Sequence, residues 1–294
     1  TMLDKWEIVT NTDNGGEAIL GDICKSLDDK LAKENIQIDE VKGIGIGLPG
    51  PVLSDGTVLQ CVNLGWGKLN VEEKLSSMFH GVTVKAGNDA NVAALGEAWK
   101  GGGKDYDDVV MITLGTGVGG GVIIGNNILT GYNGGAGEIG HFHMNDEETD
   151  VCGCGKKGCL EQYASATGIA RIAREHLAAD TKDSILQTYD LDKIDAKIVF
   201  DALKEGDQLA VDVVEEFGEY LAKGLADVAV VVDPSLFVIG GGVSKAGEIL
   251  LTYIEKYYRK RAFFANKDTQ FAIASLGNDA GICGAAKLIL DSQV

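Results

Sequence analysis

The segment Asp108–Gly131, DVVMITLGTGVGGGVIIGNNILTG, is the most glycine-rich part of this chain, and it decides which α/β fold the sequence can form. Gly115, Gly117 and Gly120 match the pattern G-x-G-x-x-G, which binds dinucleotides only where it opens a helix. Here the next residues, GVIIGNNILTG, instead predict a β-hairpin with an Asn-Asn turn. We therefore expect a strand, a Gly/Thr turn and a returning strand, in which backbone amides and the Thr116 hydroxyl can surround a phosphate. A Walker-type nucleotide site is excluded, because the chain contains no G-x-x-x-x-G-K-[ST].

Strand and helix patterns alternate along the rest of the chain, which predicts an α/β protein. Apolar residues recur at helical spacing in 17–34 and 207–232, while 41–52 alternates apolar residues with glycine and stops at a Pro-Gly-Pro turn, as a strand does. Residues 82–102 indicate a strand, a sharp turn and a helix, and 233–261 indicate a strand, a triple glycine and a helix. Three glycines after a strand let a flat ligand lie against bare backbone, although a loop that packs tightly on a neighbour explains them equally well.

Asn88 and Asp89 lie in the turn before the helix predicted within 82–102. At such a position an Asn or Asp side chain most often caps the helix by accepting its first free N–H groups. A carboxylate at a helix N-terminus is also held ionised by the helix dipole, and a general base must be ionised. The two roles can coexist, so Asp89 is a candidate general base as well as a candidate cap.

Cys152, Cys154 and Cys159 are clustered in CGCGKKGC, whereas the other three cysteines lie alone and are interpreted as small buried hydrophobic residues. The glycines between the clustered thiols let the backbone turn tightly enough to direct them toward one point. Three cysteines cannot all pair in disulfides, but they supply three ligands of a tetrahedral Cys₃His zinc site. His141 and His143 are the candidates for the fourth ligand. Four protein ligands leave no open coordination position, so the predicted zinc is structural.

Glu138 and Glu161 flank this predicted metal loop. Glu138 precedes His141 by one helical turn and Glu161 follows Cys159 by two residues, so a zinc-held loop would place both carboxylates close together. Carboxylates fixed by a rigid loop suit bidentate recognition of a neutral polyol through its hydroxyl groups. The alternative is that both are ordinary solvated glutamates.

The chain of 294 residues carries a net charge of −18 and shows no cluster of lysine and arginine, so its surface repels phosphate backbones and no nucleic-acid partner is expected. A phosphate-bearing substrate would need local donors such as backbone amides or a metal ion. No apolar run is long enough to cross a bilayer, and the first residues, TMLDKWEIVT, do not look like a signal peptide. We therefore expect a cytoplasmic globular protein without a membrane partner.

The motifs of this chain resemble, in order, those of the ROK family of repressors, uncharacterised reading frames and sugar kinases, and most closely those of its bacterial glucokinases. The resemblance covers almost the whole chain and rests on GIGLPGPV, CVNLGWG, GNDANVAALGE, ITLGTGVGGGVI, GGAGEIGH, CGCGKKGCLEQYAS and FVIGGGVS. It implies an α/β, two-domain, actin-like (ribonuclease-H-like) fold with an interdomain cleft, and ATP-dependent phosphorylation of glucose at its 6-hydroxyl. It also implies ATP, Mg²⁺ and structural Zn²⁺ as cofactors, and a homodimer.

On the sugar side, the resemblance implies a role for each candidate residue. Asp89 in GNDAN would be the general base that takes the proton from the sugar 6-hydroxyl, with Asn88 beside it on the sugar. Glu138, His141 and Glu161 would hold the other sugar hydroxyls. This fits the reading from the residues, since phosphoryl transfer needs a positioned hydroxyl, a base and amide donors rather than covalent catalysis.

On the nucleotide and metal side, the resemblance implies three further groups of contacts. Thr116 and Gly117 would contact the nucleotide phosphates. The adenosine would lie near the triple glycine, Gly240, Gly241 and Gly242. The zinc would be ligated by His141, Cys152, Cys154 and Cys159.

The sequence departs from the family at its beginning. Family kinases start with a strand-turn-strand bearing Asp-x-Gly-Gly-Thr, which cradles phosphate and helps to hold magnesium, whereas this sequence begins where the third strand is expected. DNGGE (Asp13–Glu17) is similar, but Glu17 replaces the threonine, so we interpret it as a loop and helix cap. A polypeptide without that element is expected to bind sugar but to transfer phosphoryl groups poorly. Residues 1–103 with 281–294 are expected to form the smaller domain, and 104–280 the larger one with the zinc and nucleotide loops.

Two alternatives stay open within this resemblance. The sugar could be another hexose, such as fructose, mannose or an N-acetylhexosamine, because only CVNLGWG favours glucose. The chain could also be the sugar-sensing body of a ROK transcriptional repressor. Against that alternative, it keeps Asp89, shows no helix-turn-helix pattern and is strongly acidic.

Overall fold

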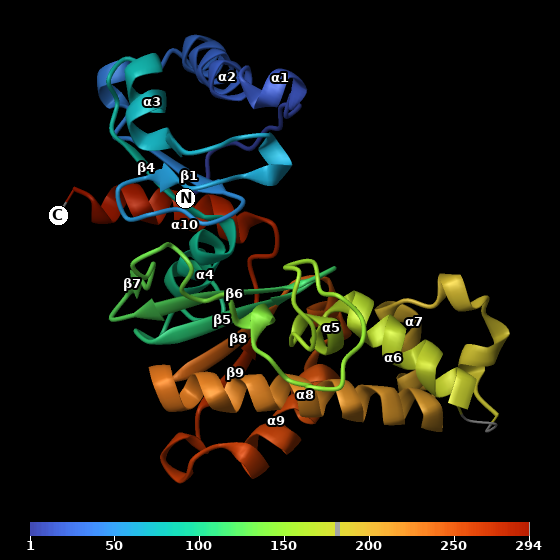
Figure 1. The fold of residues 1–294 in the computed structure, drawn as a ribbon. Coiled ribbons are helices and arrows are strands. Elements are labelled where there is room, and N and C mark those ends of the chain that lie inside the picture. Colours follow the sequence, from blue (N-terminus) through green and yellow to red (C-terminus); the bar gives the residue numbers. More distant parts are fainter. Residues whose placement is uncertain (180–182, 294) are drawn as a thin grey trace.

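The structure of residues 1–179 and 183–293, a computed structural model, is built around a mixed sheet that these described residues form from five strands (Figure 1). The strand order is β7-β6-β5-β8-β9. At its centre, β5 (Val109–Leu114) is antiparallel to β6 (Val118–Ile124) and parallel to β8 (Leu236–Gly240), which is itself parallel to β9 (Gln270–Ile273). The predicted strand, Gly/Thr turn and returning strand are therefore confirmed.

The hairpin after β6 differs from its prediction in the residues that form the turn. β6 pairs with β7 (Asn127–Ile128), so the turn consists of Gly125 and Asn126, and the predicted Asn-Asn turn is wrong. Gly125 and Asn126 both have positive φ, 54° and 65°, as a two-residue hairpin turn requires if it is to match the twist of its strands. Glycine takes this conformation at the lowest cost, so the turn falls one residue earlier.

The two faces of the sheet pack against different helices, because successive side chains of a strand point to opposite sides. On β5, Ile112 and Leu114 belong to the large core with α8 and α9, while Val109 and Met111 pack with α4. In Figure 1, α8 runs below the sheet and α9 lies below α8. The helices of this part are α4 (Asp89–Lys100), α5 (Glu161–Ala164), α6 (Ala166–Ala179), α7 (Ala196–Lys204), α8 (Gln208–Val232) and α9 (Glu248–Arg261).

The N-terminal part of the chain forms a smaller core of its own, at the top of Figure 1. Two parallel strands, β1 and β4, pack with α2 and α3, and β2 and β3 make a short antiparallel pair. The helix predicted within 17–34 and the strand, turn and helix predicted for 82–102 are confirmed. The bounds are α1 (Asp13–Gly16), α2 (Ile19–Glu34), β1 (Ile44–Leu48), β2 (Thr57–Val58), β3 (Leu69–Asn70), α3 (Val71–Met78) and β4 (Val84–Asn88).

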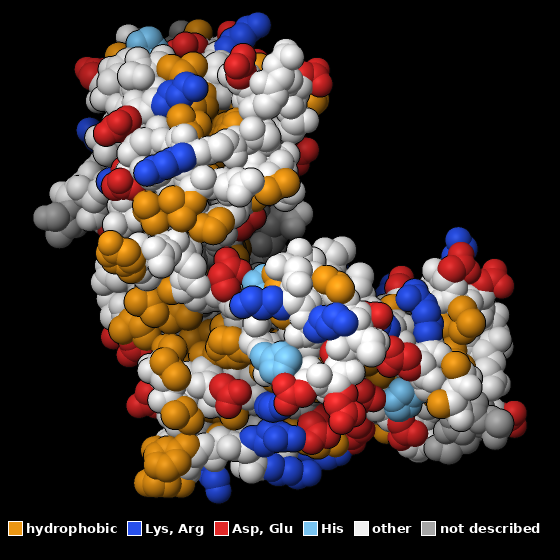
Figure 2. All heavy atoms as spheres, viewed as in Figure 1, with side chains coloured by type: hydrophobic (Ala, Val, Ile, Leu, Met, Phe, Trp, Pro, Cys, Tyr) orange, Lys and Arg blue, Asp and Glu red, His pale blue; other side chains and the backbone are white. Residues whose placement is uncertain are grey.

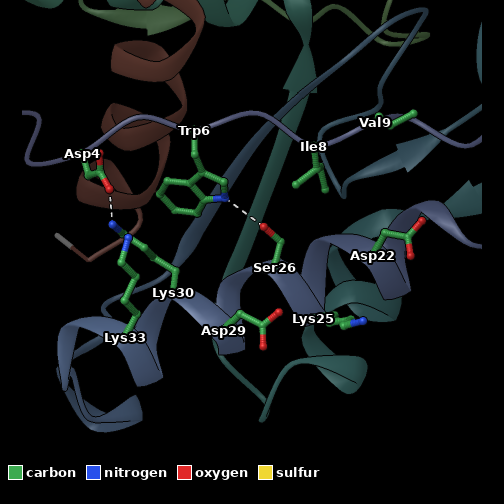
Figure 3. Close-up of a pocket in the computed structure, with 10 residues that line it drawn as sticks. All are labelled: Asp4, Trp6, Ile8, Val9, Asp22, Lys25, Ser26, Asp29, Lys30 and Lys33. Carbon is green, nitrogen blue, oxygen red and sulfur yellow. Dashed lines mark hydrogen bonds and ion pairs between the residues drawn. The ribbon is translucent and has the colours of Figure 1, made fainter.

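Residues 1–12 form neither helix nor strand, although the resemblance places a family strand there. Trp6 instead lies against α2, where its Nε1 donates to Ser26 Oγ at 2.8 Å and Lys30 lies over its ring (Figure 3). The segment DNGGE starts with the short helix α1, in which Asn14 has positive φ. The prediction that it caps a helix is wrong, because the N-cap position of α2 is Ala18, which makes no side-chain cap hydrogen bond.

Two helices join the N-terminal part to the central sheet. α10 (Asp279–Asp291), the predicted last helix, crosses α4 in close contact and also packs against β1 (Figure 1). Beside this crossing, the fully buried Glu97 of α4 accepts hydrogen bonds from the backbone N–H groups of Gly102, Ser275 and Leu276, at 2.8, 3.1 and 2.7 Å. The segment before α10 is therefore tied to the end of α4.

Figure 2 shows the surface hollowed between the N-terminal part, at the top, and the part that carries α5, α6 and α7, at the right. Within the described ranges, the helices are all too short or too polar to cross a membrane. Short 3₁₀ helices complete the connections: η1 (Ile38–Glu40), η2 (Val62–Leu64), η3 (Ile139–His141), η4 (Ile185–Thr188), η5 (Leu191–Lys193), η6 (Gly242–Ala246) and η7 (Phe264–Asn266).

Candidate active site

A cleft of about 700 Å³ lies where the end of β4, the β5–β6 turn and the loop between β7 and α5 meet. This volume is in the range of small-molecule sites. The predicted site residues that line it are Asn88, Asp89, Thr116, Gly117, Glu138, His141, Glu161 and Gly241. Residues from distant parts of the sequence are thus brought to one place.

The sequence left two roles open at this turn, helix cap and general base, and the structure gives the role of cap to Asn88. Asn88 is the N-cap of α4: its Oδ1 accepts from the N–H groups of Ala90 and Asn91 at 3.0 and 3.1 Å, and its Nδ2 donates to the Gly50 carbonyl. The Oδ1 of Asp89 also accepts from Ala90 N–H, at 2.8 Å, while its Oδ2 has no protein partner among the described residues. One carboxylate oxygen therefore remains available to a ligand in the cleft.

The electrostatic environment of Asp89 differs from what the helix terminus alone predicts. Partial burial raises the pKa of Asp89 above the usual value for an aspartic acid, and the hydrogen bond from Ala90 N–H offsets only part of that effect. The direction of this shift is opposite to the effect of a helix N-terminus, which favours the ionised form. A raised pKa makes the carboxylate a stronger base once it is ionised.

Thr116 and Gly117, two adjacent residues of the β5–β6 turn, line the cleft. Gly115 N–H donates to the Gly117 carbonyl at 3.0 Å, and Val118 N–H donates to Glu161 Oε2 at 2.9 Å. The N–H groups of Thr116 and Gly117, between them, have no acceptor among the described residues. Free adjacent amides are the donors that a phosphate requires, as predicted for this turn.

Four predicted metal ligands converge beside the cleft. The ligand atoms of His141, Cys152, Cys154 and Cys159 all lie within 4.8 Å of one another. The Sγ atoms of Cys154 and Cys159 are 3.6 Å apart, and Cys152 Sγ is 3.9 Å from His141 Nδ1. Zinc–sulfur bonds of about 2.3 Å place two tetrahedral sulfur ligands roughly 3.8 Å apart, so the four atoms fit a zinc ion.

His143, the other candidate ligand, lies outside this cluster. Its Nε2 is 2.7 Å from Asp146 Oδ1 and its Nδ1 is 3.1 Å from the Lys157 carbonyl. The hydrogen bond with Asp146, followed by that with Lys157, raises the pKa of His143. The structure thus selects His141 between the two histidines.

The thiols of the cluster differ in their environments. Burial, followed by hydrogen bonding with Cys154 and Cys152, raises the pKa of Cys159 to about 12. The pKa of Cys154 is lowered, chiefly because the backbone N–H of Lys156 stabilises its thiolate. A bound cation must displace the protons of such thiols, so metal binding here is coupled to proton release.

The two acids beside the metal loop line the same cleft but have different surroundings. Glu138 is the exposed residue before η3, whereas Glu161 is half-buried at the start of α5. Glu161 is already hydrogen-bonded through Val118 N–H, and its Oε1 lies 3.6 Å from Cys152 Sγ. Their predicted proximity to the cluster is observed, and Glu161 also contacts the β5–β6 turn.

The triple glycine reaches the cleft through one residue. Gly241 lines the cleft and has positive φ, 82°, and a Cβ there would lie 2.5 Å from the Leu114 carbonyl oxygen. Gly240 is buried in β8, and Gly242 begins η6 and does not line the cleft. Gly241 therefore shows both features that the sequence left open for the triple glycine: it lines a cleft, and its backbone packs tightly on a neighbouring strand.

Asn63 and Thr113 also line the cleft, and sequence reasoning did not single them out. Asn63 lies in η2, within CVNLGWG, and is exposed. The Trp66 indole of the same loop donates to the Gly16 carbonyl at 3.1 Å and anchors it. A polar residue held in an irregular loop by an anchored tryptophan is the signal that could have identified Asn63.

Comparison with known proteins agrees with this geometry. The pattern described as the ROK family matches residues 2–292. The chain is 43% identical to a glucokinase of Halalkalibacterium halodurans, over 99% of this chain and 89% of that protein. It is 30% identical to a xylose repressor of Caldicellulosiruptor bescii, over 86% of this chain but only 64% of the repressor.

Among solved structures, a ROK family glucokinase from Streptomyces griseus in complex with glucose and AMPPNP superposes on this chain with a TM-score of 0.74. The two are 37% identical, and the match covers 96% of this chain and 90% of that one. The expected α/β, actin-like fold is thereby confirmed. On its sequence and its fold, this chain belongs to the ROK family.

Proposed function

We propose that this chain is an ATP-dependent glucokinase that phosphorylates the 6-hydroxyl of glucose. The observation that carries the proposal is that Asp89, Thr116 and Gly117 line the same cleft. Among the described residues, Oδ2 of Asp89 and the N–H groups of Thr116 and Gly117 have no partner, so all three are available to ligands. A general base and phosphate donors in one cleft are what phosphoryl transfer to an alcohol requires. The similarity to glucokinases over nearly the whole chain supports glucose as the sugar.

In the proposed mechanism, Asp89 Oδ2 accepts the proton of the sugar 6-hydroxyl as the oxygen of that hydroxyl attacks the terminal phosphorus of ATP. The bond from this phosphorus to the bridging β-phosphate oxygen breaks, and ADP leaves. Asn88, Glu138, His141 and Glu161 bind the remaining sugar hydroxyls and orient the ring. Because Asn88 also caps α4, its side chain has a fixed direction relative to Asp89. Positioning of this kind supplies most of the rate in phosphoryl transfer.

On the nucleotide side, the amides of Thr116 and Gly117 hold the phosphates, and the adenosine lies toward Gly240, Gly241 and Gly242, of which Gly241 lines the cleft. Mg²⁺ on the nucleotide would offset phosphate charge, which a chain of net charge −18 otherwise disfavours. Zn²⁺ would be held by His141, Cys152, Cys154 and Cys159 and would fix the loop that presents the sugar-binding side chains.

The proposal includes the larger organisation of the protein. Residues 1–103 with 281–294, and 104–280, would form two units that close around the ligands and exclude water. α4 contacts both, since its Leu95 belongs to a core cluster with β5 and the helix also packs against α10 and β1. The protein would act as a homodimer in the cytoplasm, and a mass of one chain in solution would contradict the dimer.

The decisive experiment measures ADP release by a coupled assay over a panel of hexoses. Glucose should support the highest kcat/KM, and Asp89→Asn should reduce it while Asp105→Asn, an exposed aspartate outside the cleft, should not. Preference for fructose, mannose or an N-acetylhexosamine would correct the substrate. Sugar binding without ADP release would contradict kinase activity of this polypeptide; it is the result expected both of a sensor like the repressor relatives and of a kinase that lacks the Asp-x-Gly-Gly-Thr element.

A further inference from the structure

The Glu161 carboxylate lies between the metal cluster and the β5–β6 turn and contacts both. Its Oε2 accepts the Val118 N–H at 2.9 Å, and its Oε1 lies 3.6 Å from Sγ of the cluster residue Cys152. The binding of sugar hydroxyls explains neither contact. One half-buried side chain therefore connects two loops that are far apart in the sequence.

Gly117, in the same turn, has no side chain where Glu161 needs space. A Cβ on Gly117 would overlap Glu161 Oε2 and lie 3.0 Å from its Cδ, and Glu161 supplies all of the nearest atoms recorded around that position. Gly115, two residues earlier, has nothing within 4 Å of the corresponding position. Gly117 is thus matched to Glu161 specifically, whereas Gly115 is free of such a constraint.

The segment that follows Glu161 fastens the turn at two more points. Ala166 N–H donates to the Gly115 carbonyl at 2.7 Å, and Thr167 Oγ1 donates to the Thr116 carbonyl at 2.6 Å. With the bond from Val118 N–H, three hydrogen bonds thus join this segment to the turn. Cys159 precedes Glu161 by two residues, so the same short segment carries a metal ligand and the contacts to the turn.

We propose that Glu161 is a positioning residue that couples the metal cluster to the phosphate-binding turn. The metal-held loop fixes Glu161, and Glu161 fixes the turn in the conformation that directs the two free amides at a phosphate. Because coupling between two binding sites is reciprocal, metal and nucleotide each strengthen the binding of the other. The nucleotide half of this statement rests on the proposed kinase function, while the bridge from the cluster to the turn does not.

The bridge is tested by the rate at which the zinc-loaded protein releases zinc to a chromogenic chelator, with neither nucleotide nor sugar present. Gly117→Ala pushes Glu161 away without changing a metal ligand, and Glu161→Ala removes the bridge. Both should release zinc about tenfold faster than the parent, because the turn then no longer holds the segment that carries the ligands, and tenfold is a usual size for coupling between two sites. Gly115→Ala, whose new methyl group meets no atom, should release zinc at the parental rate.

A double-mutant cycle separates the bridge from general damage to the fold. In the Glu161→Ala background the atoms that obstruct a methyl group at Gly117 are gone, so adding Gly117→Ala should have no further effect on zinc release. Glu161→Gln should retain zinc at least as well as the parent, since its amide oxygen still accepts from Val118 N–H and its N–H can donate to the zinc-bound Cys152 thiolate, which a carboxylate cannot do. Additive effects in the cycle, or equal rates for Gly117→Ala and Gly115→Ala, would overturn the bridge.

The nucleotide half is tested by equilibrium binding of a non-hydrolysable ATP analogue to zinc-loaded and zinc-stripped protein. The parent and Glu161→Gln should bind it more weakly by roughly fivefold or more without zinc, which is the usual lower size of such coupling. Glu161→Ala should bind it equally in both states. Equal affinity of the parent with and without zinc would overturn the coupling, whereas no binding to the zinc-loaded parent would contradict the kinase function and leave the zinc-release result to decide the bridge.

Discussion

Gly96 of α4 and Gly284 of α10 lie backbone to backbone: a Cβ on Gly96 would be 2.9 Å from the backbone nitrogen of Gly284, and a Cβ on Gly284 would be 3.0 Å from that of Gly96. The same added atoms would overlap the carbonyl oxygens of Ala280 and Val92. The helix that begins with Asp89 is therefore held by a helix from the other end of the chain, at a distance that side chains would prevent.

The first prediction concerns this crossing. Gly284→Ala should lower the free energy of unfolding by roughly 1–3 kcal/mol, because the methyl group must push two backbones apart. Gly281→Ala, in the same helix but with nothing within 4 Å, should be neutral or stabilise the protein by up to about 1 kcal/mol. Urea unfolding of the two variants measures the difference, and equal stabilities would show that the helices do not cross so closely.

The second prediction concerns the buried Glu97. Glu97→Ala leaves the backbone N–H groups of Gly102, Ser275 and Leu276 without their acceptor, so the free energy of unfolding should fall by roughly 2–4 kcal/mol. Glu73→Ala removes an exposed glutamate from α3 and should change it by less than about 0.5 kcal/mol. Thermal or urea unfolding is the readout, and a loss of the same size in both variants would refute the role of Glu97.

The third prediction distinguishes the two histidines of the metal loop. Protein purified without chelators should contain about one zinc ion per chain. His141→Ala should lose most of it, because one of the four ligands is then missing. His143→Ala should keep it, because His143 is not a ligand and is hydrogen-bonded to Asp146 instead. Elemental analysis of the three proteins checks this, and a parent protein free of metal would contradict the zinc site.

The fourth prediction is a pH dependence of the sugar kinase reaction. The base must be ionised to accept a proton, so kcat/KM for glucose should fall as the pH drops through the pKa of Asp89. Burial raises that pKa, so the decline should begin at a higher pH than for an ordinary aspartate. Asp89→Asn should lower kcat/KM by about 10²–10⁴-fold and remove this acidic limb. An unchanged profile in the variant would exclude Asp89 as the base.

Much of the fold was predictable because it depends on local patterns. The glycine turn between β5 and β6, the capped start of α4 and the long α8 all follow from spacing that a short segment carries by itself. Two local predictions failed where neighbouring residues compete: Gly125 displaced Asn127 from the hairpin turn, and DNGGE did not cap α2.

By itself, the sequence determined that Cys152, Cys154 and Cys159 form one group and that Asp89 opens a helix, since residues only a few positions apart must lie close together in space. Only the tertiary structure showed that His141, and not His143, lies with the three thiols. It also showed that Gly241 is the one glycine of the three that lines the cleft, together with Asn63. It also set the Glu161 carboxylate against Val118, 43 residues earlier in the chain. Such long-range pairings arise from the packing of whole elements, and no spacing within a segment encodes them.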